Sequence, residues 1–296
     1  MQKYFNFFTK TSLDKLEAYT RLMRFDRPIG FLLLLWPTLA ALWIASEGFP
    51  KVHLFIIFSI GVIVMRSAGC VINDLADRKL DGHVARTSNR PLVTGEVTKE
   101  EATMLLVCLF VIALILVMFL NLKSFYWAIG GAALTMLYPF SKRLIWFPQV
   151  ILGVTFAWSV PMAFVGNDTA VTELTWLIYF INLIWIVMYD TLYAMVDRDD
   201  DIKVGIKSTA ILFGDGDRLL VGIMQAMTAI GIIILGNILG FGWVYFLAAG
   251  GVLILFLLQQ YWIKDREPAA CFRAFLNNNY VGFIWFLGVA LGYLQI

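Results

Sequence analysis

Long apolar stretches recur along almost the whole 296-residue chain, and they constrain its fold more than any other feature. Nine of them approach or exceed the roughly 20 residues that a helix needs to cross the hydrocarbon core of a bilayer. They fall at roughly 29–46, 52–73, 103–121, 124–140, 148–165, 174–195, 219–238, 242–262 and 276–295. Backbone polar groups in lipid must be satisfied within the segment, so each stretch is expected to be helical. We therefore predict an all-α membrane protein with nine transmembrane helices.

Composition agrees with this fold class and excludes several functions. Hydrophobic residues make up 60% of the chain and charged residues only 15%, whereas soluble globular proteins carry about 25% charged residues. A disordered chain, a coiled coil and a nucleic-acid-binding protein are excluded by this balance. Because the three cysteines lie in or beside apolar stretches without a C-x-x-C spacing, we expect buried free thiols at Cys70, Cys108 and Cys271.

The N-terminal segment, residues 1–27, mixes basic and acidic side chains and lacks the apolar core of a cleavable signal peptide. Between Thr11 and Phe25 the apolar residues recur at helical spacing, which predicts a helix lying along the membrane surface. The residues that carry this spacing are Leu13, Leu16, Leu22 and Phe25.

The distribution of basic residues predicts the orientation of the chain. Twenty of the 23 Lys and Arg residues fall in the N-terminal segment or in the connections that follow every second span. By the positive-inside rule, the N-terminus and the two longest connections, about 74–102 and 196–218, are cytoplasmic, and nine spans place the C-terminus outside. The three exceptions are Lys51 and Lys123, on the opposite side, and Arg66, inside the second span.

Acidic residues gather where the second span ends. Asn73, Asp77 and Asp81 are four residues apart, so they share one face if this segment is helical. Like charges at that spacing repel each other unless a cation lies between them. Magnesium ions prefer oxygen ligands and typically take one or two carboxylates together with water and substrate phosphates. The spacing therefore predicts a magnesium site at the cytoplasmic mouth of the bundle.

The end of the sixth span repeats this arrangement. Asp197 and Asp201 recur 120 residues after Asp77 and Asp81, which indicates a weak internal repeat that brings two acidic mouths together. Asp190 lies seven residues before Asp197, inside the span, where an ionisable group is costly and usually functional.

Basic residues emerge on the same side as these carboxylates, as a bound diphosphate would require, because Mg²⁺ bridges its oxygens and Lys and Arg neutralise the rest. They are Arg86, Arg90, Lys142, Arg143, Lys203 and Lys207. Arg66 lies deeper in the second span, on the face of Asn73, and two readings remain open. It either snorkels or pairs with Asp190, or it binds the carboxylate of a small substrate.

A diphosphate held at the mouth of an apolar, aromatic-rich bundle indicates a lipid diphosphate substrate, with its tail among the helices. The metal and the cations would stabilise diphosphate as it leaves. If the tail is allylic, aromatic faces would stabilise the resulting carbocation, and an apolar cavity would keep water away from it.

The paired motifs resemble those of the UbiA-type membrane prenyltransferases. They read Asn-Asp-x-x-Asp-x-x-x-Asp at 73–81 and Asp-x-x-x-Asp at 197–201. The resemblance runs from about residue 15 to the end, and the other matching segments are 21–30, 35–37, 68–74, 81–83, 189–191, 193–201, 205–214 and 277–282.

The resemblance implies nine transmembrane helices around a central cavity, in one domain spanning 1–296, in the inner membrane of a bacterium with the active site at its cytoplasmic face. It also implies Mg²⁺-dependent transfer of a polyprenyl chain, octaprenyl in most members, from polyprenyl diphosphate to the carbon ortho to the phenol of 4-hydroxybenzoate, an early step of ubiquinone biosynthesis.

The implied roles follow the motif positions. Asn73, Asp77, Asp81, Asp197 and Asp201 would hold the metal–diphosphate. Arg86, Lys142 and Arg143 would bind diphosphate or help to position the substrates. Arg66 would bind the benzoate carboxylate, and Asp190 would assist with the phenolic proton.

Two other membrane-protein functions share some of these features. The aspartate motif of CDP-alcohol phosphatidyltransferases fits poorly, because Arg78, Lys99 and Thr103 stand at three of its four acidic positions. A secondary transporter is compatible with Asp190 and with a repeat, but it has no need for two chelating clusters at one mouth.

Overall fold

The computed structural model describes residues 13–82 and 87–295, and that part of the chain is helical without any strand. Side chains are not described at 79–81, 142 and 204. The helices are α2 (Ile29–Ala45), α3 (Val52–Asp81), α4 (Pro91–Thr94), α5 (Lys99–Met118), α6 (Leu122–Leu144), α7 (Pro148–Ala157), α8 (Ser159–Gly166), α9 (Glu173–Val204), α10 (Thr209–Phe213), α11 (Asp217–Ile238), α12 (Trp243–Trp262) and α13 (Pro268–Gly292).

Seven helical segments within the described residues are long and apolar enough to cross a membrane, which makes the chain a multi-pass membrane protein. They are α3, α5, α7 with α8, α9, α10 with α11, α12 and α13. The other two predicted spans are also helices, but α2 has only 17 residues and α6, with 23, is less apolar.

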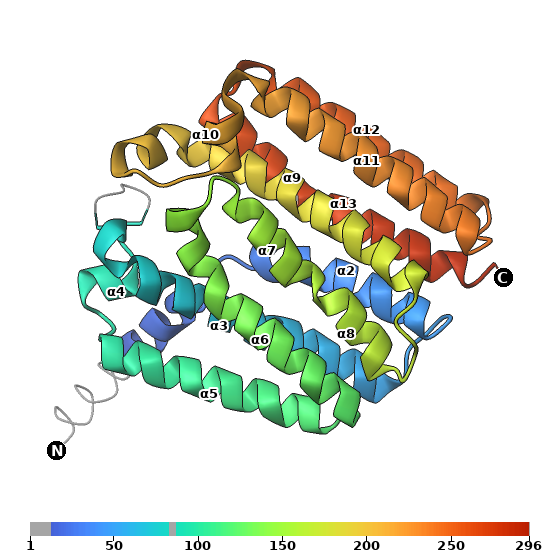
Figure 1. Cartoon of the computed structure of the whole chain (residues 1–296), viewed down its shortest axis with the longest axis horizontal. Coiled ribbons are helices and arrows are strands. Elements are labelled where there is room, and N and C mark those ends of the chain that lie inside the picture. Colours follow the sequence, from blue (N-terminus) through green and yellow to red (C-terminus); the bar gives the residue numbers. More distant parts are fainter. Residues whose placement is uncertain (1–12, 83–86, 296) are drawn as a thin grey trace.

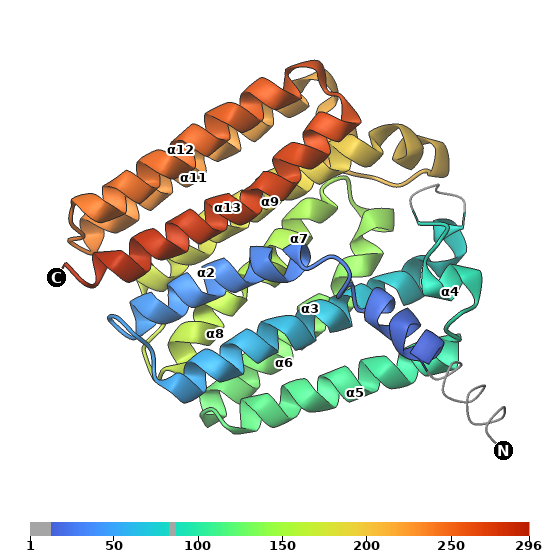
Figure 2. The same ribbon diagram turned by 180° about the vertical axis from the view of Figure 1, so that it is seen from behind.

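The long helices lie side by side, with α11 and α12 on one flank and α5 on the other (Figures 1 and 2). Between these flanks, α9 packs against α7, α11 and α13, and α2 packs against α3, α8 and α13. The main hydrophobic core follows these contacts, and its largest fully buried side chains include Trp185, Tyr245 and Phe256.

A proline explains the break between α7 and α8. Pro161 has no backbone N–H, so it cannot form the helical hydrogen bond to the carbonyl of Ala157, where α7 ends. The two short helices together still cover Pro148–Gly166, close to the predicted span 148–165.

Both acidic segments are the last turns of long helices, so the predicted connections 74–102 and 196–218 begin within α3 and α9. The 30 residues of α3 extend about 45 Å and the hydrocarbon core is about 30 Å thick, so the end of α3 can project beyond it. The 32-residue α9 ends at the same end of the bundle (Figure 1).

Three details differ from the sequence-based expectations. The N-terminal helix, residues 13–22, buries Ala18 and Leu22 against the cluster around α3 and α5, and it leaves Leu13 and Leu16 exposed. The prediction of three buried thiols is wrong at Cys108, which is exposed because most of α5 faces outward. The last helix begins at Pro268, eight residues before the predicted 276.

Candidate active site

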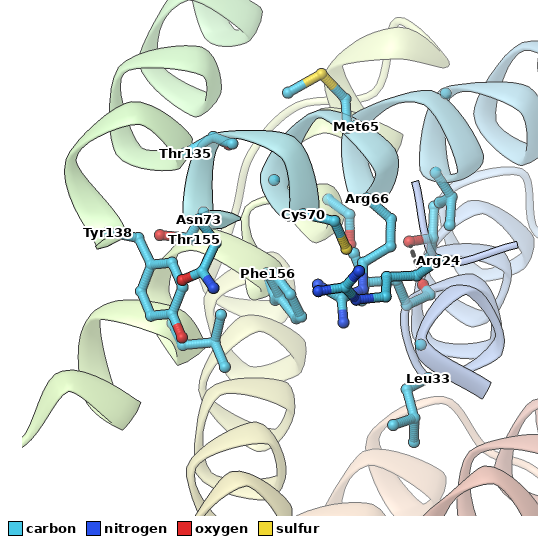
Figure 3. Close-up of a pocket in the computed structure, with 18 of the residues that line it drawn as sticks. Arg24, Leu33, Met65, Arg66, Cys70, Asn73, Thr135, Tyr138, Thr155 and Phe156 are labelled. Carbon is cyan, nitrogen blue, oxygen red and sulfur yellow. Dashed lines mark hydrogen bonds between the residues drawn. The ribbon is translucent and has the colours of Figure 1, made fainter. Parts of the chain in front are cut away.

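A cavity of about 1040 Å³ lies within the bundle, lined by residues of α2, α3, α5–α9 and α13 and by the N-terminal segment. Figure 3 shows part of its wall. Arg66, Cys70 and Asn73 come from α3, Tyr138 from α6 and Phe156 from α7.

The acidic end of α3 is held by an arginine from α6. Asp77 is nearly buried, and its Oδ1 lies 3.4 Å from Nη2 of Arg143, which also donates to the carbonyl of Ala76 at 2.6 Å. Arg143, predicted to bind diphosphate, therefore lies directly beside a predicted metal ligand. Asn73, one turn before Asp77, lines the cavity together with Tyr138 (Figure 3).

The second acidic segment occupies the last turns of α9. Asp197 and Asp201 are partly buried there, and Asp190, two turns before Asp197, lines the cavity. No group of three or more His, Cys, Asp or Glu side chains that could hold a metal forms among the described residues. The side chain of Asp81, the last residue of α3, lies outside that described set.

A buried network fixes the end of α9. Asp217 is only 1% exposed at its side chain, and its carboxylate lies 2.8 Å from Nε of Arg266 and 3.6 Å from Nη1 of Arg198. Arg198 directly follows Asp197, so this contact ties the acidic turn to the start of α11.

Asp74, which lies between Asn73 and Asp77 in sequence, forms ion pairs with two arginines. Its carboxylate is 1% exposed and accepts hydrogen bonds at 2.9 Å from Nη2 of Arg24, and Nη1 of Arg90 also lies 2.9 Å away. Two arginines from the segments before α2 and before α4 are thus fixed at the mouth of the cavity, which both of them line.

The N-terminal helix is tied to the same region by further ion pairs. Lys15 pairs with Glu101 at 2.7 Å, and Arg21 pairs with Glu96. The hydrogen bond from Thr94, together with Arg21, lowers the pKa of the Glu96 carboxyl, so this pair stays charged at neutral pH.

Arg66 has the most unusual environment of the predicted residues. Its Nε is buried without a hydrogen-bond partner among the described residues, and its guanidinium carbon lies 5.5 Å from the centroid of the Phe156 ring. Gly30 makes room for it, since a Cβ there would lie 2.9 Å from Nε. A buried donor of this kind is costly unless a ligand completes it.

Two further features complete the cavity. The hydroxyl of Tyr189 is also buried and unpartnered within the described part of the chain. Apolar side chains form the part of the wall that α5 and the first half of α6 contribute, and they include Ala113, Leu114, Val117, Phe125, Ala128 and Ile129.

The structure thus brings Arg66, Asn73 and Asp190 onto one cavity and places Arg143 against Asp77. Arg86 lies outside the described residues, as does the side chain of Lys142. Polar lining residues that sequence reasoning had not singled out include Arg24, Tyr189 and Asn279. Asn279 could have been identified from the sequence, because polar residues inside an apolar span are often functional.

Comparison with known proteins gives the family. The profile of the UbiA prenyltransferase family matches residues 34–287. A protein of Saccharophagus degradans named 4-hydroxybenzoate octaprenyltransferase is 53% identical over 93% of this chain and 92% of its own length. One of the same name from Providencia stuartii is 50% identical over 96% of this chain and 98% of its own.

Solved structures show the same fold. A UbiA homologue from Aeropyrum pernix K1 superimposes with a TM-score of 0.78 at 24% identity, covering 88% of this chain and 97% of that one. A homologue from Archaeoglobus fulgidus, bound to GPP and Mg²⁺, has a TM-score of 0.71 at 18% identity and covers 94% and 100%. From the matched profile and the relatives of about half-identical sequence, the chain belongs to the UbiA prenyltransferase family.

Proposed function

We propose that this protein transfers an octaprenyl group from its diphosphate to the ring carbon ortho to the hydroxyl of 4-hydroxybenzoate, in an early step of ubiquinone biosynthesis. The observation that carries the proposal is the cavity itself. Its wall combines a buried arginine, Arg66, whose Nε has no hydrogen-bond partner among the described residues, with apolar side chains and the start of the acidic turn of α3. The names of the relatives supply the acceptor and the chain length.

The ends of α3 and α9 are the proposed metal site. Its ligands would be Asn73, Asp77, Asp81, Asp197 and Asp201, on two helices that end on the same side of the bundle. An oxygen-only donor set of carboxylates and one amide suits Mg²⁺, which leaves positions for water and phosphate oxygens. When bound, Mg²⁺ would supply positive charge to the oxygens of the diphosphate.

Basic residues beside these ligands would hold the rest of the leaving group. Arg143 already contacts Asp77, and we assign it to diphosphate binding together with Arg86 and Lys142. In the reaction the bond between the prenyl C1 and the diphosphate oxygen breaks, and its electron pair leaves with diphosphate. The ring carbon ortho to the hydroxyl bonds to C1 and then loses its own proton.

The aromatic acceptor would bind deeper in the cavity. The guanidinium of Arg66 would bind the carboxylate, since a buried cation whose Nε has no partner within the described part of the chain matches an anionic group in a low-dielectric site. Asp190, on the wall of the same cavity, would assist with the phenolic proton. The apolar wall from α5 and α6 would hold the prenyl tail and exclude water from the reacting carbon.

We further propose that α2 and α6 also cross the membrane, which gives nine spans in one domain covering 1–296. The N-terminus and the acidic helix ends would face the cytoplasm of a bacterial inner membrane, because the connections rich in Lys and Arg lie at that end of the bundle.

Product analysis by mass spectrometry tests the proposed reaction. Membranes containing the protein are supplied with 4-hydroxybenzoate, Mg²⁺ and prenyl diphosphates of graded tail length. We expect a prenylated hydroxybenzoate, most abundant with the octaprenyl donor. No prenylated acid with any donor would refute the reaction, and uptake of a solute into vesicles that persists in EDTA would favour a transporter instead.

A further inference from the structure

Two donors in the membrane-spanning part of the cavity wall lack a hydrogen-bond partner in the part of the chain that the structure describes. They are Nε of Arg66 on α3 and the hydroxyl of Tyr189 on α9. Tyr189 is only 2% exposed. An unmatched polar group is costly in such surroundings, because lipid cannot provide the missing hydrogen bond. Both donors therefore indicate a ligand with acceptor oxygens.

Two other buried tyrosines show how such a hydroxyl is satisfied when its role is structural. Tyr179, on the same helix as Tyr189, donates to the carbonyl of Val154 on α7 at 3.3 Å. Tyr245 on α12 donates to the carbonyl of Ile232 on α11 at 2.8 Å. Neither of them lines the cavity, whereas Tyr189 does. Of these three tyrosines, the one whose hydroxyl has no partner within the described chain is thus the one at the cavity.

Arg66 and Tyr189 reach the cavity from two different groups of helices. Helix α3 packs against α2, α5 and α6, whereas α9 packs against α7, α11 and α13. The guanidinium of Arg66 and the hydroxyl of Tyr189 nevertheless lie close enough to interact electrostatically. One small group can therefore contact both donors, and the positive charge of Arg66 favours an anionic one.

The depth of the two donors agrees with the proposed reaction. Arg66 precedes Asp77 by 11 residues on α3, and Tyr189 precedes Asp197 by eight residues on α9. These separations correspond to about 16 Å and about 12 Å of helix, so both donors lie well below the acidic helix ends and at similar depth. A benzoate whose carboxylate lies there can direct its hydroxyl and ortho carbon back toward the acidic ends, where diphosphate would leave.

We propose that the hydroxyl of Tyr189 donates a hydrogen bond to one carboxylate oxygen of the aromatic acid while Arg66 binds the other. An ionised carboxyl group has two oxygens with about four acceptor positions, so it can accept from both donors at once. Tyr189 then adds to the specificity for an acid, because its hydroxyl stays unpaired when no acceptor is bound. This inference rests on the proposed function, since it assumes that the acceptor is an aromatic acid.

Equilibrium binding to the purified full-length protein, without prenyl diphosphate, tests the assignment. Binding of radiolabelled 4-hydroxybenzoate is measured directly, and binding of benzoate, which keeps the carboxylate but lacks the hydroxyl, is measured by displacement. Tyr189→Phe should weaken binding of both acids by the same factor, about 10-fold, because each loses one hydrogen bond to a charged oxygen. The Tm of the ligand-free variant should equal that of the wild-type protein, since the hydroxyl has no hydrogen bond to lose within the described residues.

Tyr179→Phe is the matched control on the same helix. It breaks the hydrogen bond to the carbonyl of Val154, so it should lower the Tm by about 1–3 °C and leave both dissociation constants unchanged. The inference is overturned if Tyr189→Phe binds 4-hydroxybenzoate as tightly as the wild-type protein does. It is also overturned if that variant weakens binding of 4-hydroxybenzoate alone, which would place the Tyr189 hydroxyl at the phenolic oxygen. If the wild-type protein binds neither acid, the proposed function fails and this inference fails with it.

Discussion

The ion pairs of Asp74 predict that this residue stabilises the fold. Asp74 belongs to the same acidic motif as Asp77, yet its 1% exposed carboxylate is fully engaged by Arg24 and Arg90 at 2.9 Å. It therefore connects the segments before α2 and before α4 to α3, and we expect it to stabilise the fold without binding the metal. Asp74→Asn tests this, because an amide keeps the size of the side chain and removes its charge.

The expected loss of stability follows from the two arginines that the substitution leaves without a counter-charge. Two arginines whose side chains are only 21% and 15% exposed would lose their shared counter-charge. Removing one partner of a buried ion pair costs about 3–5 kcal/mol. At about 2 °C per kcal/mol for a chain of this size, the apparent Tm in detergent should fall by about 6–10 °C. Glu101→Gln breaks the half-exposed pair with Lys15 and should cost at most about 1 kcal/mol.

The assay is thermal unfolding followed by size-exclusion chromatography of the detergent-solubilised protein, with and without Mg²⁺. Asp74→Asn should lower the Tm by the same amount in both conditions, since Asp74 is not expected to touch the metal. A Tm equal to that of the wild-type protein would refute the reasoning. A loss of stability seen only in the presence of Mg²⁺ would show that Asp74 is a ligand after all.

Four further outcomes are expected. Asp77→Ala and Asp197→Ala should each abolish turnover while the protein still inserts in the membrane, and wild-type turnover by either would contradict the metal assignment. Arg66→Ala should raise KM for the aromatic acid about 10- to 100-fold, as expected for loss of a charged hydrogen bond, and change KM for the prenyl diphosphate less. Gly30→Ala, whose Cβ would lie 2.9 Å from Nε of Arg66, should produce a smaller rise in the same constant. Cys108 should react fastest of the three cysteines with a lipid-soluble maleimide, since it alone is exposed, and protection equal to that of the others would count against the position of α5.

Helical periodicity and apolar length predicted most of the fold. Eight of the nine predicted spans each correspond to one main helix and the span 148–165 to the pair α7 and α8, because long apolar segments in lipid have few other ways to satisfy their backbone. The start of α13 lies eight residues before the predicted 276, because Arg273 interrupts the apolar pattern there, although its guanidinium carbon lies 4.0 Å from the centroid of the Trp262 ring. Hydropathy alone cannot show that a helix continues through such a charged residue.

The site was only partly predictable, because several of its contacts join residues that are far apart in the sequence. Spacing placed Asn73 and Asp77 on one face of a helix, and the structure has them one turn apart on α3. No local rule could pair Asp74 with Arg24, which lies 50 residues earlier in the chain. The depth of Arg66 in its span was evident from the sequence. The lack of a hydrogen-bond partner for its Nε among the described residues, and its contact with Phe156, depend on how α2, α3 and α7 pack together.

The most direct test of the account measures the reaction of the purified protein in lipid nanodiscs with octaprenyl diphosphate and ring-labelled 4-hydroxybenzoate. We expect one diphosphate released for each molecule of acid that gains a prenyl group ortho to its hydroxyl, with complete loss of product in EDTA and recovery on addition of Mg²⁺. Release of diphosphate without a prenylated acid, or product formation that continues in EDTA, would contradict the central claim.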